Sequence, residues 1–163
     1  MKITKKQLRQ IKLAVFDFDG VMTDDTVYID QFGHEMVRVS RADGLAINIL
    51  KNRGVSLLIL SSEINQVVEK RAEKLNIPVL HGMSDKVAAL KQYVIDNGID
   101  LQQTLYVGND LNDIEVMKIV GISVSPSNAN RSVRKISKIK LKTSGGYGVI
   151  RELSDLWYGK DLK

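Results

Sequence analysis

The sequence predicts an α/β protein built on a doubly wound parallel sheet, Rossmann-like in its order of elements. Short apolar runs typical of buried strands alternate with amphipathic stretches typical of helices along the whole chain. Several of these apolar runs end abruptly in polar clusters. Parallel sheets of this kind bind ligands beyond the carboxyl ends of their strands. We therefore expect one domain over residues 1–163, with the clusters at Asp17, Ser61 and Gly108 converging on one crevice.

The first strand, over residues 13–16, carries the strongest chemical signal. It ends in Asp17 and Asp19, and Gly20 then allows a sharp turn. Because side chains alternate along an extended chain, the two carboxylates leave the strand with the same general heading. A divalent cation such as Mg²⁺, which prefers oxygen ligands, would compensate their charge. An isolated Asp-x-Asp is more often a solvated turn, so the case depends on the segments that follow.

The remaining elements follow from hydrophobic period and from glycine and proline positions. After the first strand we expect a hairpin over 26–39, a helix from Asp43 to Arg53, a strand over 55–60, a helix over 65–75, and a short strand over 78–80. We then expect a helix over 86–97, a strand over 104–107, a helix ending at Val120, a strand over 122–124, a short basic helix, a strand over 136–142, and a last helix containing Trp157. His34 falls in the hairpin turn, where we expect no catalytic role.

Composition excludes several classes of protein. The chain has no cysteine, so it has no disulfide or thiol nucleophile, which suits a reducing compartment. No apolar run is long enough for a signal peptide or a membrane span, and a cytoplasmic location is expected. The net charge of +5 gathers partly over residues 131–142, but no stacking aromatics are interleaved there. A solvated basic face is favoured over nucleic-acid binding, and no membrane partner is expected.

Residues 17–24 resemble the first motif of the haloacid dehalogenase superfamily of phosphotransferases. The resemblance implies that Asp17 is a nucleophile forming an aspartyl-phosphate and that Asp19 is the general acid. Ser61 matches the second motif, a hydroxyl that hydrogen-bonds phosphate, although a serine there is by itself more often a turn or cap residue. Lys86 matches the third, a lysine that pairs with phosphate and Asp17, although alone it would be a solvated first-turn residue.

The fourth motif is the segment 108–113, whose acids are implied to complete a Mg²⁺ site with Asp17 and the main-chain carbonyl of Asp19. Many relatives have Gly-Asp-Asp where this chain has Gly108-Asn109-Asp110. An amide oxygen can bind Mg²⁺ but brings no charge, so metal affinity or turnover is expected to be lower. Either Asn109 or Asp110 is the third protein ligand, and the charge of Asp110 favours it slightly.

The resemblance covers the whole chain and leaves room for only the small hairpin in place of a cap domain. This arrangement is similar to the capless phosphatases of 3-deoxy-D-manno-octulosonate 8-phosphate and of sialic-acid-type nine-carbon 9-phosphates. It implies a homotetramer assembled by hairpins, in which a glycine-rich tail, about 143–163 here, helps close a neighbouring site. The residues implied to contact a 2-keto-3-deoxy sugar acid phosphate are Ser62, Glu63, Arg71, Lys74, Gly145, Gly146 and Arg151.

Glu63 favours the nine-carbon substrate, because the octulosonate enzymes typically have arginine just after the second motif. On a helix, however, Arg71 and Lys74 at three-residue spacing could equally be a solvated pair. The chain also looks like the phosphatase-like domain of some CMP-N-acylneuraminate synthetases, but it lacks the length for a nucleotidyltransferase domain. A weakly active or inactive tetramerisation domain is therefore the alternative to an enzyme, and Asn109 is its main argument.

Overall fold

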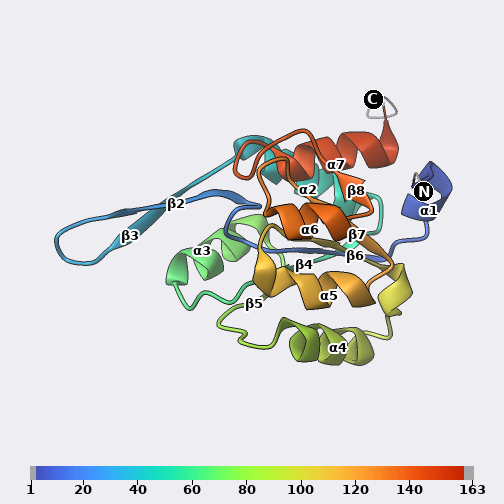
Figure 1. Ribbon diagram of the computed structural model, residues 1–163, viewed down its shortest axis with the longest axis horizontal. Coiled ribbons are helices and arrows are strands. Elements are labelled where there is room, and N and C mark those ends of the chain that lie inside the picture. Colours follow the sequence, from blue (N-terminus) through green and yellow to red (C-terminus); the bar gives the residue numbers. More distant parts are fainter. Residues whose placement is uncertain (1–2, 160–163) are drawn as a thin grey trace.

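The computed structural model describes residues 3–159, and the predicted fold class is confirmed in it (Figure 1). Six parallel strands form one sheet in the order β5-β4-β1-β6-β7-β8, with helices on both faces. The strands are β1 (Leu13–Phe16), β4 (Ser56–Leu60), β5 (Val79–Leu80), β6 (Thr104–Val107), β7 (Ile122–Ser125) and β8 (Ile139–Lys140). Because β1 lies between β4 and β6, its acids emerge near the middle of the carboxyl edge.

Side chains of β1 alternate between two hydrophobic layers, as a strand buried on both faces requires. Ala14 and Phe16 face one layer, and Leu13 and Val15 face the other. The first layer is covered by α1 (Lys5–Leu8), α2 (Arg41–Asn52), α3 (Gln66–Leu75) and α7 (Val149–Tyr158). The second layer is covered by α4 (Lys86–Asp96), α5 (Ile114–Ile119) and α6 (Arg131–Ile136). Two short 3-10 helices, η1 (Leu101–Gln103) and η2 (Leu111–Asp113), precede β6 and α5.

The hairpin stands apart from the main sheet and projects from it (Figure 1). Its strands are β2 (Thr23–Ile29) and β3 (Glu35–Val39), so it begins three residues earlier than the expected 26–39. The reason is a bulge: Thr23 pairs with Val39 and Val27 with Val37, which leaves unequal lengths of chain between the two pairs. His34 lies in the exposed turn and contacts Asp30.

The strand expected over 136–142 is wrong for most of its length. Residues up to Ile136 belong to α6, and the strand β8 spans only Ile139–Lys140. Beyond it, the amides of Lys142 and Thr143 donate to the carboxylate of Glu152 and so make no strand ladder. The alternating lysines therefore belong to an exposed edge strand. This strand ends early because the Glu152 side chain of α7 accepts the main-chain amides that follow it.

Among residues 3–159, no helix has both the length and the apolar composition to cross a bilayer.

Candidate active site

A pocket of about 310 Å³ lies at the carboxyl edge of the sheet, where β1 and β6 end. It is lined by Asp17, Asp19, Asp25, Glu63, Asn109, Asp110, Leu111 and Asn112. The expected convergence of the polar clusters that follow β1, β4 and β6 is therefore present in the structure. Asp25 was not among the predicted residues.

The first acid of the pocket, Asp17, is almost completely buried and is held from two sides. Its Oδ1 accepts the main-chain N–H of Phe18 at 2.8 Å, and Lys86 Nζ lies 2.9 Å from the same oxygen. Within the described part of the chain, no hydrogen bond reaches its Oδ2. Lys86 therefore neutralises one side of the carboxylate and leaves the other oxygen able to face a ligand.

Asp113 anchors this arrangement, and the sequence analysis gave it no separate role. Its Oδ1 accepts hydrogen bonds from Lys86 Nζ and from the Tyr106 hydroxyl, each at 2.8 Å. Its Oδ2 accepts a hydrogen bond from the main-chain N–H of Asn109 at 2.8 Å. All of its carboxylate is buried. Gly108 leaves the space for it, because an added Cβ there would lie 2.6 Å from the Asp113 side chain. In the sequence, the only sign of this role was an acidic residue five positions after Gly108.

The charges of this buried cluster do not balance. Burial and the neighbouring Asp113 raise the pKa of Asp17 well above its usual range, against the opposing effect of Lys86. Burial lowers the pKa of Lys86, but Asp17 and Asp113 outweigh this and raise it overall. One cation therefore serves two buried carboxylates, an excess of negative charge that a bound cation would relieve.

Asp19 lies on the open side of the pocket and is only partly buried. Burial, with Glu63 and Asp25 nearby, raises its pKa from 3.8 to about 6. The Thr23 hydroxyl donates to its Oδ1 at 3.4 Å. A carboxyl group with a pKa near 6 holds a proton far more readily at neutral pH than an ordinary aspartate, as a general acid requires.

Asn109 and Asp110 occupy different positions, although both line the pocket. Asn109 is buried, and its side chain lies so close to Gly20 that a Cβ there would come within 1.9 Å of Asn109 Nδ2. Asp110 is exposed, and its Oδ1 accepts the amide of Leu111, where it caps η2. The geometry therefore turns Asn109 towards the loop that carries Asp17 and Asp19.

The donor set suits a hard cation but is sparse. Residues with carboxylate and amide side chains line one pocket, and Mg²⁺ prefers oxygen ligands of these kinds. Within residues 3–159, however, no group of three or more histidine or acidic side chains is arranged to hold a metal ion. The carboxylate of Asp113 is not free to be a further metal ligand, because Lys86 and Tyr106 both donate to its Oδ1. A metal here would therefore depend on Asn109 or on main-chain oxygen for part of its shell.

The second-motif residues lie at the end of β4. Ser61 is buried, and its Oγ accepts the amide of Glu63 at 3.1 Å. Asn112 donates to Ser62 Oγ at 3.3 Å, which connects this loop to η2. Glu63 lines the pocket and also a neighbouring groove of about 520 Å³ between the hairpin turn and α3.

Arg71, Lys74 and Arg151 do not line the pocket. Arg71 donates from Nη2 to the Ser40 carbonyl at 2.9 Å and faces Asp43, so within one chain it fastens α3 to the start of α2. Lys74 is exposed further along α3. Arg151 donates from Nε to Asp155 on the surface of α7. Their roles in substrate binding stay predictions.

The glycine-rich segment packs against its own chain beneath the hairpin. A Cβ on Gly145 would lie 2.1 Å from the Gly20 carbonyl oxygen, and one on Gly146 would lie 2.5 Å from the Asp24 amide. Arg38 of β3 covers the Tyr147 ring at 4.0 Å. These contacts explain the glycines within one chain, and a contribution to a neighbouring site stays a prediction. The last part of the expected tail, 160–163, lies outside the described residues.

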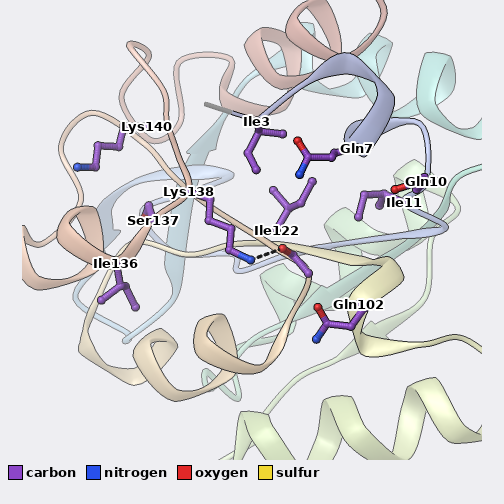
Figure 2. Close-up of a pocket in the computed structure, with 11 residues that line it drawn as sticks. Ile3, Gln7, Gln10, Ile11, Gln102, Ile122, Ile136, Ser137, Lys138 and Lys140 are labelled. Carbon is purple, nitrogen blue, oxygen red and sulfur yellow. Dashed lines mark hydrogen bonds between the residues drawn. The ribbon is translucent and has the colours of Figure 1, made fainter. Parts of the chain in front are cut away.

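A larger cavity of about 770 Å³ lies at the opposite, amino edge of the sheet (Figure 2). Its lining combines isoleucines with glutamine amides and two lysines, and Lys138 Nζ donates to the Gly121 carbonyl. None of the predicted site residues lines it. Size alone would have selected the wrong end of the molecule.

Comparison with known proteins identifies the family of this chain. The haloacid dehalogenase-like hydrolase family matches residues 57–153. The 3-deoxy-D-manno-octulosonate 8-phosphate phosphatase KdsC of Yersinia pestis is 32% identical over 90% of this chain and 79% of its own length. N-acylneuraminate cytidylyltransferase A of Danio rerio is 25% identical over 89% of this chain, which spans only 34% of that enzyme.

Solved structures also place this chain among the haloacid dehalogenase-like hydrolases. A HAD family hydrolase from Streptomyces avermitilis superposes with a TM-score of 0.93 at 44% identity, over 99% of this chain and 91% of the other. The 3-deoxy-D-manno-octulosonate 8-phosphate phosphatase of Moraxella catarrhalis, solved with magnesium, phosphate and KDO, has a TM-score of 0.91 at 30% identity, over 94% of this chain and 89% of that one.

Proposed function

Because this chain belongs to the haloacid dehalogenase-like hydrolases and is a phosphatase, we propose that it hydrolyses a 2-keto-3-deoxy sugar acid phosphate with the help of Mg²⁺. The observation that carries this proposal is the pairing of Asp17 with Lys86 at 2.9 Å, in a pocket that Asp19 shares. Nucleophile, cation and acid thus occupy one site, as phosphoryl transfer requires.

In the proposed reaction an oxygen of Asp17 attacks phosphorus, and the bond from phosphorus to the ester oxygen breaks. Asp19 gives its proton to the departing alkoxide, which leaves as the alcohol. Asp19 then takes a proton from water, whose oxygen attacks the aspartyl-phosphate and restores the Asp17 carboxylate. Lys86, already beside Asp17 Oδ1, offsets the negative charge of the transferring group, and Ser61 lies at the neighbouring strand end to donate to a phosphate oxygen.

The proposed metal ligands are Asp17, the main-chain carbonyl of Asp19 and Asn109. Burial of Asn109 against Gly20 supports it over Asp110, which caps η2 from the surface. This reverses the slight preference for Asp110 that its charge suggested. When bound, Mg²⁺ would supply positive charge beside Asp17 and Asp19, whose pKa values are raised first of all by burial.

For the sugar we propose a nine-carbon sialic acid type 9-phosphate first and the octulosonate 8-phosphate second. Glu63 supports this order, because it lines the pocket and the 520 Å³ groove that continues towards the hairpin turn. A carboxylate there can accept hydrogen bonds from hydroxyl groups of a long sugar chain. The similarity to octulosonate phosphatases supports the second substrate.

The test is phosphate release from both sugar phosphates and an aryl phosphate, with and without Mg²⁺, with Asp17→Asn as the control. Selective Mg²⁺-dependent release from the nine-carbon ester, absent in the variant, would support the proposal in full. Preference for the octulosonate ester would keep the mechanism and remove the argument from Glu63. No release from folded protein on any ester would refute the hydrolase.

A second candidate function is a weakly active domain that assembles a tetramer beside a synthetase. The hairpin supports assembly, because it exposes several large apolar side chains: Val27, Tyr28, Ile29, Phe32 and Met36. We expect Ile29→Asp to lower the molar mass in sedimentation equilibrium, whereas the surface change Ile95→Asp on α4 should not. An unchanged mass for Ile29→Asp would remove the hairpin from the interface.

A further inference from the structure

Asp25 lies at the base of the hairpin in an unusual backbone conformation. Its φ is 67°, and Asn76, which caps the end of α3, is the one other non-glycine residue between 3 and 159 with a positive φ. Left-handed backbone is unfavourable for a residue with a side chain, although aspartate tolerates it better than most. The bulge between Thr23 and Val27 contains Asp25. Bulges beside active sites commonly redirect a side chain, and this one brings Asp25 to the pocket.

One hydroxyl group fixes Asp25 relative to the reacting groups. Thr23 is fully buried, and its Oγ1 accepts the amides of Gly20 and Asp25, each at 3.2 Å. The same hydroxyl donates to Asp19 Oδ1 at 3.4 Å. The loop after β1, the general acid and the base of the hairpin are therefore connected through a single side chain. Asp25 is held near Asp19 by the fold, not by chance at a mobile tip.

The side of the pocket away from Lys86 is strongly acidic. Asp25, Glu63 and Asp110 line it together with Asp19. Lys86 is engaged with Asp17 and Asp113 on the buried side, and among residues 3–159 no lysine or arginine lines the pocket. In the proposed reaction the phosphate occupies the Lys86 side, so the alcohol portion of the ester must lie against these carboxylates.

We propose that Asp25 is a specificity-determining residue that rejects phosphate esters with a negative charge close to the ester oxygen. This inference rests on the proposed hydrolase function. Asp25 accepts hydrogen bonds from hydroxyl groups on the carbons beside the ester and repels a carboxylate placed there. A sugar acid substrate must then carry its phosphate at the end of the chain far from its carboxylate. Short esters such as phosphoglycolate are excluded by charge.

The test compares two small esters that differ in the charge of the leaving alcohol: glycerol 1-phosphate and phosphoglycolate. Asp25→Asn removes the charge and suits the left-handed backbone, and Asp25→Gly also removes the side chain. Asp30→Asn is the matched control, because it removes a carboxylate from the turn of the same hairpin, outside the pocket. A unit charge several ångströms away at a solvent-exposed site should change the ratio of kcat/KM values about three- to tenfold.

We expect both Asp25 variants to raise kcat/KM for phosphoglycolate relative to glycerol 1-phosphate, and Asp30→Asn to leave the ratio unchanged. A ratio that stays within about twofold in both Asp25 variants, while the native protein turns over, overturns the role of Asp25 and keeps the hydrolase. Equal changes in Asp30→Asn would also overturn it, because they would show a general effect of net charge.

A binding measurement separates this inference from the hydrolase. Calorimetric titration of both esters, with Mg²⁺ present, is made on Asp17→Asn and on Asp17→Asn combined with Asp25→Asn. If the native protein releases no phosphate but the second variant gains affinity for phosphoglycolate alone, Asp25 selects by charge although the hydrolase proposal fails. If there is neither turnover nor a charge-dependent difference in binding, both proposals fail.

Discussion

The two sides of the active-site pocket are built in opposite ways. On the side of Lys86, buried groups bind one another: Lys86 contacts Asp17 and Asp113, and Tyr106 donates to Asp113, at 2.8 to 2.9 Å. On the other side, Asp25 and Glu63 are exposed carboxylates, and in the described part of the chain no basic side chain lines the pocket beside them. The first side resembles a protein core, and the second resembles a charged surface.

This difference separates two tasks of a phosphatase. The phosphoryl group is the same in every substrate, so the groups that handle it can be buried and fixed. The leaving alcohol varies, and residues that contact it can change without disturbing the core. Substitutions on the buried side should therefore alter both stability and turnover, whereas substitutions of the exposed carboxylates Asp25 and Glu63 should alter substrate preference alone.

The largest effect is expected for Lys86→Met. It removes the cation shared by Asp17 and Asp113 and leaves two buried carboxylates facing each other. Breaking a buried ion pair in this way costs about 3–5 kcal/mol. We expect a fall of that size in the free energy of unfolding by urea, together with loss of phosphate release. An unchanged free energy of unfolding in Lys86→Met would contradict the difference between the two sides of the pocket. The control is Lys118→Met, which removes an exposed cation on α5.

The next test concerns a buried carboxyl group without a lysine. Burial raises the pKa of Asp43 to about 6, against the lowering effects of the Arg151 and Ile150 amides and of Arg71. Because the folded-state value exceeds the unfolded one, the folded protein binds more protons between about pH 4 and pH 6. Stability from this group is therefore greatest below pH 4 and is lost as pH rises through 6, by up to about 3 kcal/mol.

Urea unfolding of the native protein and Asp43→Asn at pH 4.5 and pH 7.5 measures this contribution. The free energy of unfolding of the native protein should fall relative to the variant as pH rises, because asparagine does not titrate. A constant difference would show that Asp43 does not change its protonation between these two pH values. Burial of Asp43 would then make no pH-dependent contribution to stability.

Tyr106→Phe should have a smaller effect on the buried side. It removes one hydrogen bond to a charged acceptor, Asp113, and keeps the ring that packs in the core. Such bonds contribute about 1.5–3 kcal/mol. We expect the midpoint of urea unfolding to fall and kcat to fall several-fold with KM little changed. Tyr93→Phe on α4, whose tyrosine is only half-buried, is the control, and an unchanged kcat in Tyr106→Phe would limit Tyr106 to a structural role.

The smallest effect on stability is expected for Glu63→Gln on the open side. The side chain is exposed, so the free energy of unfolding should change by less than about 0.5 kcal/mol. The preference between the nine-carbon and octulosonate esters should nevertheless change several-fold in kcat/KM. If Glu63→Gln lowered the free energy of unfolding as much as Tyr106→Phe, the two sides of the pocket would not differ in their contribution to stability.

The sequence predicted the fold class and the meeting of Asp17, Asp19 and Asn109, because strand ends in a parallel sheet must share one edge, and the family resemblance predicted the pairing of Lys86 with Asp17. It did not predict the directions taken inside loops. Asp113 turns inwards to Lys86 because a 3-10 turn directs it there, and Asp25 reaches the pocket because a bulge does. Both depend on partners distant in the chain, which local patterns do not encode. The strand expected over 136–142 failed for the same reason, since Glu152 takes the main-chain amides of Lys142 and Thr143.

The chain of contacts from Tyr106 through Asp113 to Lys86 and Asp17 connects β6, η2, α4 and the end of β1. No one of these elements can open without breaking that chain. The main-chain N–H of Asn109 donates to Asp113, so it should exchange its hydrogen with solvent only when the whole domain unfolds. The Asp25 amide is bonded at the foot of a projecting hairpin and should exchange through local fluctuations. One side of the pocket would then be rigid, and the other side would undergo local fluctuations.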